Sequence, residues 1–418
     1  NAGTSVTEGN ANVLIGAIAG DAITTGTNNV AVGDSTLGAI TTSSNNTAIG
    51  HNAGFTLTSG SQNVFAGTNA GKLQTTAANN VAVGFNALDA TIGGGSNVAV
   101  GAAALGANTT GVQNTAVGAD ALDANTTAAN NVAVGYSALG ANTTGTYNTA
   151  VGWKSLSKNT TANSNSAFGE SALINTTEGA NNTAVGQSTL NSNITGGNNT
   201  AVGFEALKIN LTSNNTAVGY QALDACTSGS PNTAIGFGAL GAVSTGAQND
   251  AHGHGAGGAI NTGNYNVAMG MNAGATATSA NSNTSIGAWA NYLGTAASNT
   301  AIGAFVLDAA SFSGANNTAV GSGAASAMTT GASNSALGFG ALALCTTGQS
   351  NAVFGVNAGT AITTSVGNTM YGMSAGGLTT TGGSNIFIGY TTGDANTTGS
   401  SNIIIGAGTD VSAVDNTY

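Results

Sequence analysis

The side chains best suited to binding a ligand stand together in one short segment, Asp250-Ala251-His252-Gly253-His254. Imidazole nitrogens are common ligands of transition metals, and two histidines separated by one residue lie on the same side of an extended strand. If three parallel chains met at this level, six imidazoles would share one axis, which suits octahedral coordination of a transition metal. The alternative is a simple histidine substitution at a surface bend. His252 and His254 are therefore the metal candidates, and no other cofactor is expected.

The rest of the composition argues against catalysis. The chain has 418 residues but only three histidines, and no nucleophile, phosphate loop or Ser/His/acid set can be assembled. Glycine-rich stretches reflect the 66 glycines of the chain and carry no motif. We predict that the protein is not an enzyme.

Charge narrows the set of partners. Four lysines, no arginine and 15 acidic residues give a formal net charge of −11. Nucleic acid is a poor partner, because binding its phosphates needs clustered Lys or Arg. The same shortage disfavours an anionic membrane surface. The chain also lacks a run of about 18 apolar residues, so no membrane insertion is expected.

A sequence repeat runs along the whole chain and includes the Asp250–His254 segment. The pattern Asn-x-x-x-Gly occurs 24 times at a 17-residue period, and three of the 23 intervals differ from that period by one residue. We call the last residue of this pattern the repeat glycine. Self-similarity at a short period predicts stacked coils rather than a globular core. Representative asparagines are Asn114, Asn131, Asn148, Asn182, Asn199, Asn215 and Asn232, and the matching glycines are Gly118, Gly135, Gly152, Gly186, Gly203, Gly219 and Gly236.

Each copy reads as one coil of a β-structure. Short β-branched segments alternate with Asn, Gly and Thr turns inside every copy of the repeat, which disfavours helix. The sequence predicts an all-β protein, a parallel β-solenoid of 24 coils. The asparagines would form a ladder of amides between coils, and the repeat glycine would adopt a conformation that a β-carbon forbids. The expected organisation is a lead-in over 1–11, a continuous array over 12–406 and a tail over 407–418.

The strand segments are apolar on both faces. The residue before the repeat glycine is apolar in 22 of 24 copies, and the one before that is mostly Ala. Because neighbouring strand residues point to opposite faces, one of the two apolar faces would point out of the coil. Strands that are apolar on both faces are usually covered on both, so we infer that another chain covers the outer face by lateral oligomerisation. Four residues after the repeat glycine, Leu is uninterrupted from Leu88 to Leu240, whereas Gly gathers near the ends. The central coils should therefore bury more apolar volume and resist fraying.

Several other groups of residues have less specific interpretations. Cys226 and Cys345 hold the same repeat position about 33 Å apart at the sheet spacing, so no intrachain disulfide is expected.

Asn-x-Thr triplets at Asn108, Asn125, Asn142, Asn159, Asn193, Asn210 and Asn396 could accept glycans. Aspartates five residues after the repeat glycine (Asp21, Asp89, Asp123, Asp224, Asp308, Asp394) are too sparse for a calcium repeat and are interpreted as solvated charges. Aromatic residues directly after the repeat glycine either stack on glycans or, as we prefer, seal coil and chain contacts.

The runs Asn131-Val132-Ala133-Val134-Gly135-Tyr136-Ser137-Ala138-Leu139 and Asn215 to Leu223 resemble the head repeats of trimeric autotransporter adhesins. They are even more similar to repeat arrays of phage tail-fibre and related surface-fibre proteins. The resemblance implies a left-handed parallel β-roll, three chains side by side, attachment to a surface or receptor, and metal binding through His-x-His. The adhesin heads use a shorter coil than the one found in this chain.

We therefore expect an extracellular, cell-surface or virion protein, a structural fibre or stalk that displays an adhesive, receptor-binding surface. Its expected partners are itself, as a homotrimer or homopolymer, and a cell-surface receptor or glycan. One alternative is a filament subunit that polymerises end to end through exposed strand edges. Another is an ice-binding or glycan-binding solenoid, although the Thr-Thr pairs such as Thr109-Thr110 lie beside turns rather than on a strand face.

Overall fold

The computed structural model describes residues 1–410, and the chain divides into two compact units, Asn1–Ser213 and Asn214–Tyr418, called unit 1 and unit 2. No residue of the described range is helical. Unit 1 contains β1 (Val13–Ile15), β2 (Val30–Val32), β3 (Thr47–Ile49), β4 (Val64–Ala66), β5 (Val81–Val83), β6 (Val98–Val100), β7 (Thr115–Val117), β8 (Val132–Val134), β9 (Thr149–Val151), β10 (Ser166–Phe168), β11 (Thr183–Val185) and β12 (Thr200–Val202).

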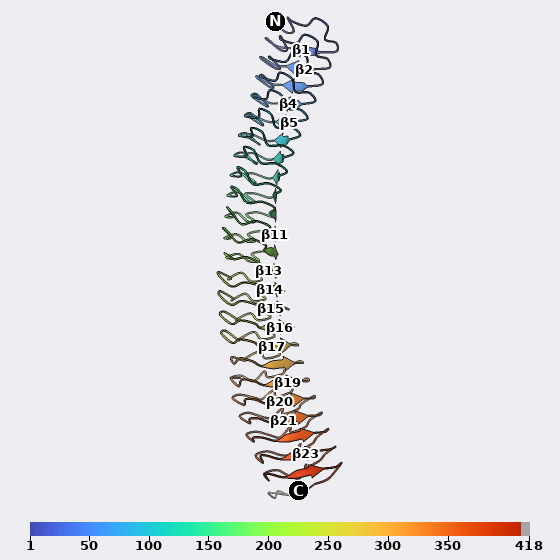
Figure 1. Ribbon diagram of the computed structural model, residues 1–418, viewed down its shortest axis with the longest axis vertical. Coiled ribbons are helices and arrows are strands. Elements are labelled where there is room, and N and C mark those ends of the chain that lie inside the picture. Colours follow the sequence, from blue (N-terminus) through green and yellow to red (C-terminus); the bar gives the residue numbers. More distant parts are fainter. Residues whose placement is uncertain (411–418) are drawn as a thin grey trace. The chain divides into compact units, whose positions relative to one another are not determined.

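Unit 2 repeats this arrangement with its own strands. They are β13 (Thr216–Val218), β14 (Asn232–Ile235), β15 (Asn249–His252), β16 (Val267–Met269), β17 (Thr284–Ile286), β18 (Thr300–Ile302), β19 (Thr318–Val320), β20 (Ser335–Leu337), β21 (Ala352–Phe354), β22 (Thr369–Tyr371), β23 (Ile386–Ile388) and β24 (Ile403–Ile405). Figure 1 shows one strand in each coil, with successive coils stacked in chain order within a unit.

Within each unit, neighbouring strands are parallel and in register. Thr115 of β7 lies opposite Val132 of β8, and Thr216 of β13 lies opposite Thr233 of β14, in both cases one repeat period further along the chain. One coil is therefore one copy of the sequence repeat. The predicted all-β parallel β-solenoid with one repeat per coil is confirmed.

Stacking also involves residues outside the predicted array. The N–H of Gly3 donates to the carbonyl of Ala19 at 3.0 Å, so part of the lead-in 1–11 lies on the first coil. The N–H of Gly408 donates to the carbonyl of Tyr390 at 2.8 Å. Of the predicted tail 407–418, residues 411–418 lie outside the described residues.

The core of each coil is built from three inward positions. The first is the middle residue of the strand, such as Ala116, which is buried between partly exposed Thr115 and Val117. The second lies four residues after the repeat glycine, where Leu122 is buried with a φ of 50°. A left-handed conformation costs a residue with a β-carbon about 1–2 kcal/mol, and burial of the leucine side chain offsets that cost. Glycine takes the same φ without strain, which explains why Leu and Gly alternate at this position.

The third inward position lies seven residues after the repeat glycine. It is apolar in the first coils of unit 1 but polar in the later ones, where Nδ2 of Asn125 donates to Oδ1 of Asn108 at 2.9 Å. Nδ2 of Asn142 continues the series to Oδ1 of Asn125 at 3.1 Å. The buried residues at this position are Ile23, Ile40, Leu57, Gln74, Thr91, Asn108, Asn125, Asn142, Asn159, Thr176, Asn193 and Asn210.

The expectation that the leucine-rich central coils bury more apolar volume does not hold at every coil. At several positions where glycine replaces leucine, a large strand residue fills the space: a β-carbon added at Gly71 would lie 2.5 Å from the ring of Phe65. In unit 2, an added β-carbon at Gly376 would lie 2.5 Å from Met370, and one at Gly393 would lie 2.7 Å from the Phe387 ring. The central coils of unit 1 meanwhile carry buried amides at the third position. Apolar volume gives no reason for the ends to fray first.

Two coils of unusual length lie side by side in unit 2. The interval from Gly287 to Gly303 has one residue fewer than the period, and the next interval has one more. Strand register is kept in both, since Thr284 pairs with Thr300 and Thr300 with Thr318. The difference in length is therefore absorbed by the turns.

Candidate functional site

The asparagines chosen from the repeat form a continuous ladder inside each unit. The backbone N–H of each donates to Oδ1 of the preceding one at 2.8–3.1 Å, through eleven bonds in unit 1 and eleven in unit 2. Nδ2 of Asn114 also donates to the carbonyl of Ala128 at 2.8 Å, in the turn of the following coil. Each asparagine of the ladder therefore bonds the coil before it through its backbone N–H and the coil after it through its side chain. The ladder positions include the buried residues Asn114, Asn131, Asn148, Asn182, Asn199, Asn215 and Asn232.

The repeat glycines stand where the backbone of the next coil comes closest. A β-carbon added at Gly118 would lie 2.5 Å from the carbonyl oxygen of Gly135. The φ angle of these residues is also one that side chains with a β-carbon rarely adopt. It spans 131–141° at Gly118, Gly135, Gly152, Gly186, Gly203, Gly219 and Gly236.

One extended surface feature of each unit is the outward side of its strands. We call the two ranks of residues one and three places before the repeat glycine the outer strand face. Apolar side chains in the first rank are well exposed, including Ile49 at 48%, Phe168 at 42% and Leu337 at 46%. Asp250 and His252 are the only acidic and basic side chains in either rank. Such a contiguous apolar surface is typical of an interface.

Threonine is common in the second rank of this face as well as in the Thr-Thr pairs beside the turns. Eleven of the 24 strands carry Thr three places before the repeat glycine: Thr47, Thr115, Thr149, Thr183, Thr200, Thr216, Thr233, Thr284, Thr300, Thr318 and Thr369. The sequence predicts the Thr-Ala-Val strands correctly, but not the outward direction of their threonines. Alternation along the strand is the signal that could have placed them there.

The two candidate metal ligands have separate neighbours. Nε2 of His252 lies 2.9 Å from Oδ1 of Asp250, and both side chains are on the outer strand face of β15. His254 follows the bend at Gly253, and its ring stacks on that of Phe237 with the centroids 5.0 Å apart. Within residues 1–410 no three His, Cys, Asp or Glu side chains gather in a way that could hold a metal ion. Metal binding at His252 and His254 stays a prediction.

Aromatic residues after the repeat glycine stack from coil to coil. The rings of Tyr220 and Phe237 are 5.1 Å apart and 5° from parallel, and His254 extends the stack. Inside this stack the ring faces cover each other, while 44% of Tyr220 and 52% of Phe237 remain exposed. Ring faces that stack on one another are not open to a sugar, which stacks on a ring face. This geometry favours sealing of contacts over glycan stacking.

The cysteines and most Asn-x-Thr triplets point into the core. Cys226 and Cys345 are buried, and neither forms a disulfide. Burial raises the pKa of the Cys345 thiol to about 11, although a backbone hydrogen bond of Gly348 acts in the opposite direction. The triplet asparagines are fully buried at the third inward position, so the suggestion that they accept glycans fails for the folded chain: Asn108, Asn125, Asn142, Asn159, Asn193, Asn210 and Asn396.

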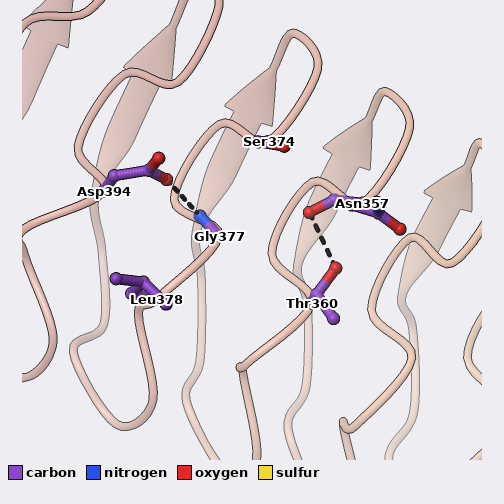
Figure 2. Close-up of a pocket in the computed structure, with 6 residues that line it drawn as sticks. All are labelled: Asn357, Thr360, Ser374, Gly377, Leu378 and Asp394. Carbon is purple, nitrogen blue, oxygen red and sulfur yellow. Dashed lines mark hydrogen bonds between the residues drawn. The ribbon is translucent and has the colours of Figure 1, made fainter.

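The aspartates five residues after the repeat glycine are half-buried rather than fully solvated. Burial raises the pKa of the Asp89, Asp123, Asp308 and Asp394 carboxyls. Lys72 opposes this rise at Asp89. In unit 2, Asp394 lines a pocket of about 400 Å³ together with Asn357, Thr360, Ser374, Gly377 and Leu378 (Figure 2). Sequence reasoning missed this pocket, because its residues come from three coils and belong to no motif.

Comparison with known protein families and with curated proteins gives no match to this chain. None of the structure described, up to residue 410, contains a helix long and apolar enough to cross a membrane.

Proposed function

We propose that the protein is a structural fibre or stalk in which three copies associate through their outer strand faces and carry a receptor-binding surface. The observation that supports this most is the outer strand face itself, whose first rank consists mainly of Val, Ile and larger apolar side chains that are exposed or half-buried, with His252 as the one basic residue. Water contact with such a surface is unfavourable by about 25 cal/mol per Å², and covering it with another copy removes that cost. The resemblance to trimeric fibres favours three chains side by side, each a left-handed solenoid.

The charges on this face are compatible with burial. Asp250 and His252 are its only acidic and basic side chains, and they already pair at 2.9 Å. A paired acid and base tolerate an interface better than either alone, because neither is left uncompensated. If three chains meet here, His252 and His254 of each chain also come to one level, where the transition metal is proposed to bind.

The hydrogen bonding inside each unit favours a stiff structural element over an enzyme. Within each unit, successive coils are joined by strand pairing and by the asparagine ladder, so bending a unit would stretch buried hydrogen bonds. A role outside the cell, at a cell surface or on a virion, follows from this fibre proposal. End-to-end polymerisation is the alternative assembly.

The assembly is tested by measuring the mass of the intact particle together with low-resolution imaging. A bounded particle with the mass of three chains supports the proposal, and an indefinite polymer supports the filament instead. Replacing Val83, Val117 and Val185 together with Lys should convert the trimer into monomers. The matched control places Lys at Thr110, Thr127 and Thr144, which are exposed at turns and should leave the mass unchanged.

Ice binding is a second candidate, favoured by one observation. The outer strand face presents threonines in register on parallel strands, for example Thr183 opposite Thr200, a regular array of hydroxyl and methyl groups. The two functions need the same face in different states, covered in a trimer and open in an ice binder. Thermal hysteresis from a monomeric chain would favour ice binding, and its absence from a trimer agrees with the fibre.

A further inference from the structure

The pocket of Figure 2 crosses three consecutive coils of unit 2. Asn357 and Thr360 come from the coil after β21, Ser374 and Leu378 from the coil after β22, and Asp394 from the coil after β23. In Figure 2 the carboxylate of Asp394 reaches toward Gly377 of the neighbouring coil. The side chains thus surround a shallow depression that is open to solvent.

One carboxylate oxygen in this pocket is fixed and the other is available. Oδ1 of Asp394 accepts a hydrogen bond from the backbone N–H of Gly377 at 3.1 Å, which orients the carboxylate. The absence of a β-carbon at Gly377 leaves room for this approach. An oriented, ionised carboxylate accepts strong hydrogen bonds from ligand hydroxyl groups.

Further polar groups and an apolar surface complete the pocket. Neither the side-chain amide of Asn357 nor the hydroxyl of Ser374 hydrogen-bonds to another described residue, so both can bind a ligand. The hydroxyl of Thr360 is instead held by the carbonyl of Asn357 at 2.7 Å. Leu378 is 58% exposed and offers an apolar patch beside these groups. A carboxylate, an amide and a hydroxyl next to exposed carbon match the alternating hydroxyl and C–H surfaces of a sugar ring.

The charges around the pocket select against acidic sugars. All four lysines, Lys72, Lys154, Lys158 and Lys208, precede unit 2, and the chain has no arginine. The nearby Asp410 raises the pKa of the Asp394 carboxyl further, beyond the effect of burial. A carboxylated or sulfated ligand would therefore be repelled with no cation to offset the repulsion.

In the coils of unit 1 that carry Asn52, Asn69 and Asn86, the corresponding groups are already engaged. Nδ2 of Asn69 donates to Oδ1 of Asn86 at 3.0 Å, and Nδ2 of Asn52 donates to Oδ1 of Asn69 at 3.3 Å. The positive charge of Lys72 acts on Asp89 at the position equivalent to Asp394. The unit 2 pocket differs because its amide, hydroxyl and carboxylate remain open.

We propose that this pocket binds a neutral hexose, with the free oxygen of Asp394 accepting hydrogen bonds from ring hydroxyls and Leu378 contacting the C–H face. This inference rests on the proposed fibre function and specifies it further, because the bound hexose would be part of the receptor. Asn357 and Ser374 supply the remaining polar contacts.

The test is saturation-transfer NMR and calorimetry on the intact chain with methyl glucoside, methyl mannoside and methyl galactoside. At least one should bind, and N-acetylneuraminic acid should not. Asp394→Asn keeps an acceptor for Gly377 but removes the charge, and should weaken binding about tenfold or more. Leu378→Thr should weaken it as well. Asp123→Asn, at the same repeat position in unit 1, should leave binding unchanged.

Absence of binding by all three glycosides, equal binding by Asp394→Asn and the wild type, or tighter binding of the acidic sugar would overturn the proposal. Circular dichroism and thermal melting of each variant show whether a loss arises from misfolding. The particle mass separates the two proposals: a trimer that binds no hexose defeats this inference alone, whereas a monomer that binds hexose through Asp394 defeats the fibre and keeps the site.

Discussion

The backbone N–H of Asn114 donates a hydrogen bond of 2.9 Å to Oδ1 of Asn97, which stands 17 residues earlier and one coil away. Oδ1 of Asn114 accepts the next bond, from the N–H of Asn131 at 3.0 Å. A single side-chain type thus satisfies buried backbone groups that strand pairing does not reach, and it does so with the same period as the fold.

Replacing Asn114 with Ala should destabilise unit 1 by about 2–4 kcal/mol, because it leaves the N–H of Asn131 and the carbonyl of Ala128 buried without the bonds they now make. Urea unfolding monitored by circular dichroism measures the change. Thr110→Ala, at an exposed turn, is the control and should shift stability by less than about 0.5 kcal/mol. Equal stability of the two variants would mean that the ladder contributes nothing.

Replacing Gly118 with Ala should destabilise the fold by about 2 kcal/mol or more, since the new β-carbon meets the Gly135 carbonyl and φ is 139°. Gly93→Ala is the matched control, because an added β-carbon there meets nothing within 4 Å. That change should be neutral or stabilise by up to about 1 kcal/mol, through the unfolded state. Thermal melting of both variants decides the point, and a similar loss in each would contradict it.

Phe65 and Gly71 should show strong energetic coupling. Phe65→Ala alone should cost about 3–5 kcal/mol by leaving a cavity. Adding Gly71→Leu restores the common combination of Ala in the strand and Leu four residues after the repeat glycine, and should recover part of that loss. Gly71→Leu alone should clash with the Phe65 ring. A double-mutant cycle in denaturant measures the coupling, and additive effects would rule out a shared space.

The Cys345 thiol should stay unreactive in the folded chain. Its pKa is raised from 9.0 to about 11 by burial, so the folded state favours the protonated form. The corresponding stabilisation is complete below pH 9 and is lost as the pH rises from about 9 to about 11, because the unfolded chain ionises first. Iodoacetamide labelling and unfolding across this range test both statements. A Cys345→Ala variant lacks this group, and an unchanged pH dependence in it would assign the effect elsewhere.

Much of the fold could be predicted because the signal is periodic. The regular recurrence of Asn implies that equivalent residues of successive repeats stack on one another. It also implies that the strand containing Ala116 turns one face toward the core. The Leu-to-Gly alternation is visible in the sequence, where it suggests a loss of apolar volume. Only the folded structure shows that the Phe65 ring fills the space beside Gly71 and that Leu122 has a positive φ.

The candidate sites were less accessible to sequence reasoning. His252 and His254 form a recognisable pair, yet the bend at Gly253 gives them different neighbours, Asp250 and Phe237. Asn108 and its equivalents match a glycan acceptor motif, yet they are buried. The pocket at Asp394 brings together residues from three coils, and no local pattern marks it.

The amino-acid pattern alone establishes a stack of parallel coils, because a 17-residue period of Asn and Gly allows one geometry in which equivalent hydrogen bonds repeat. The folded chain adds which side chains face inward and which lie open between coils. Inward direction depends on backbone angles within each turn, and a pocket depends on neighbours one period away, so neither can be read from a single copy of the repeat.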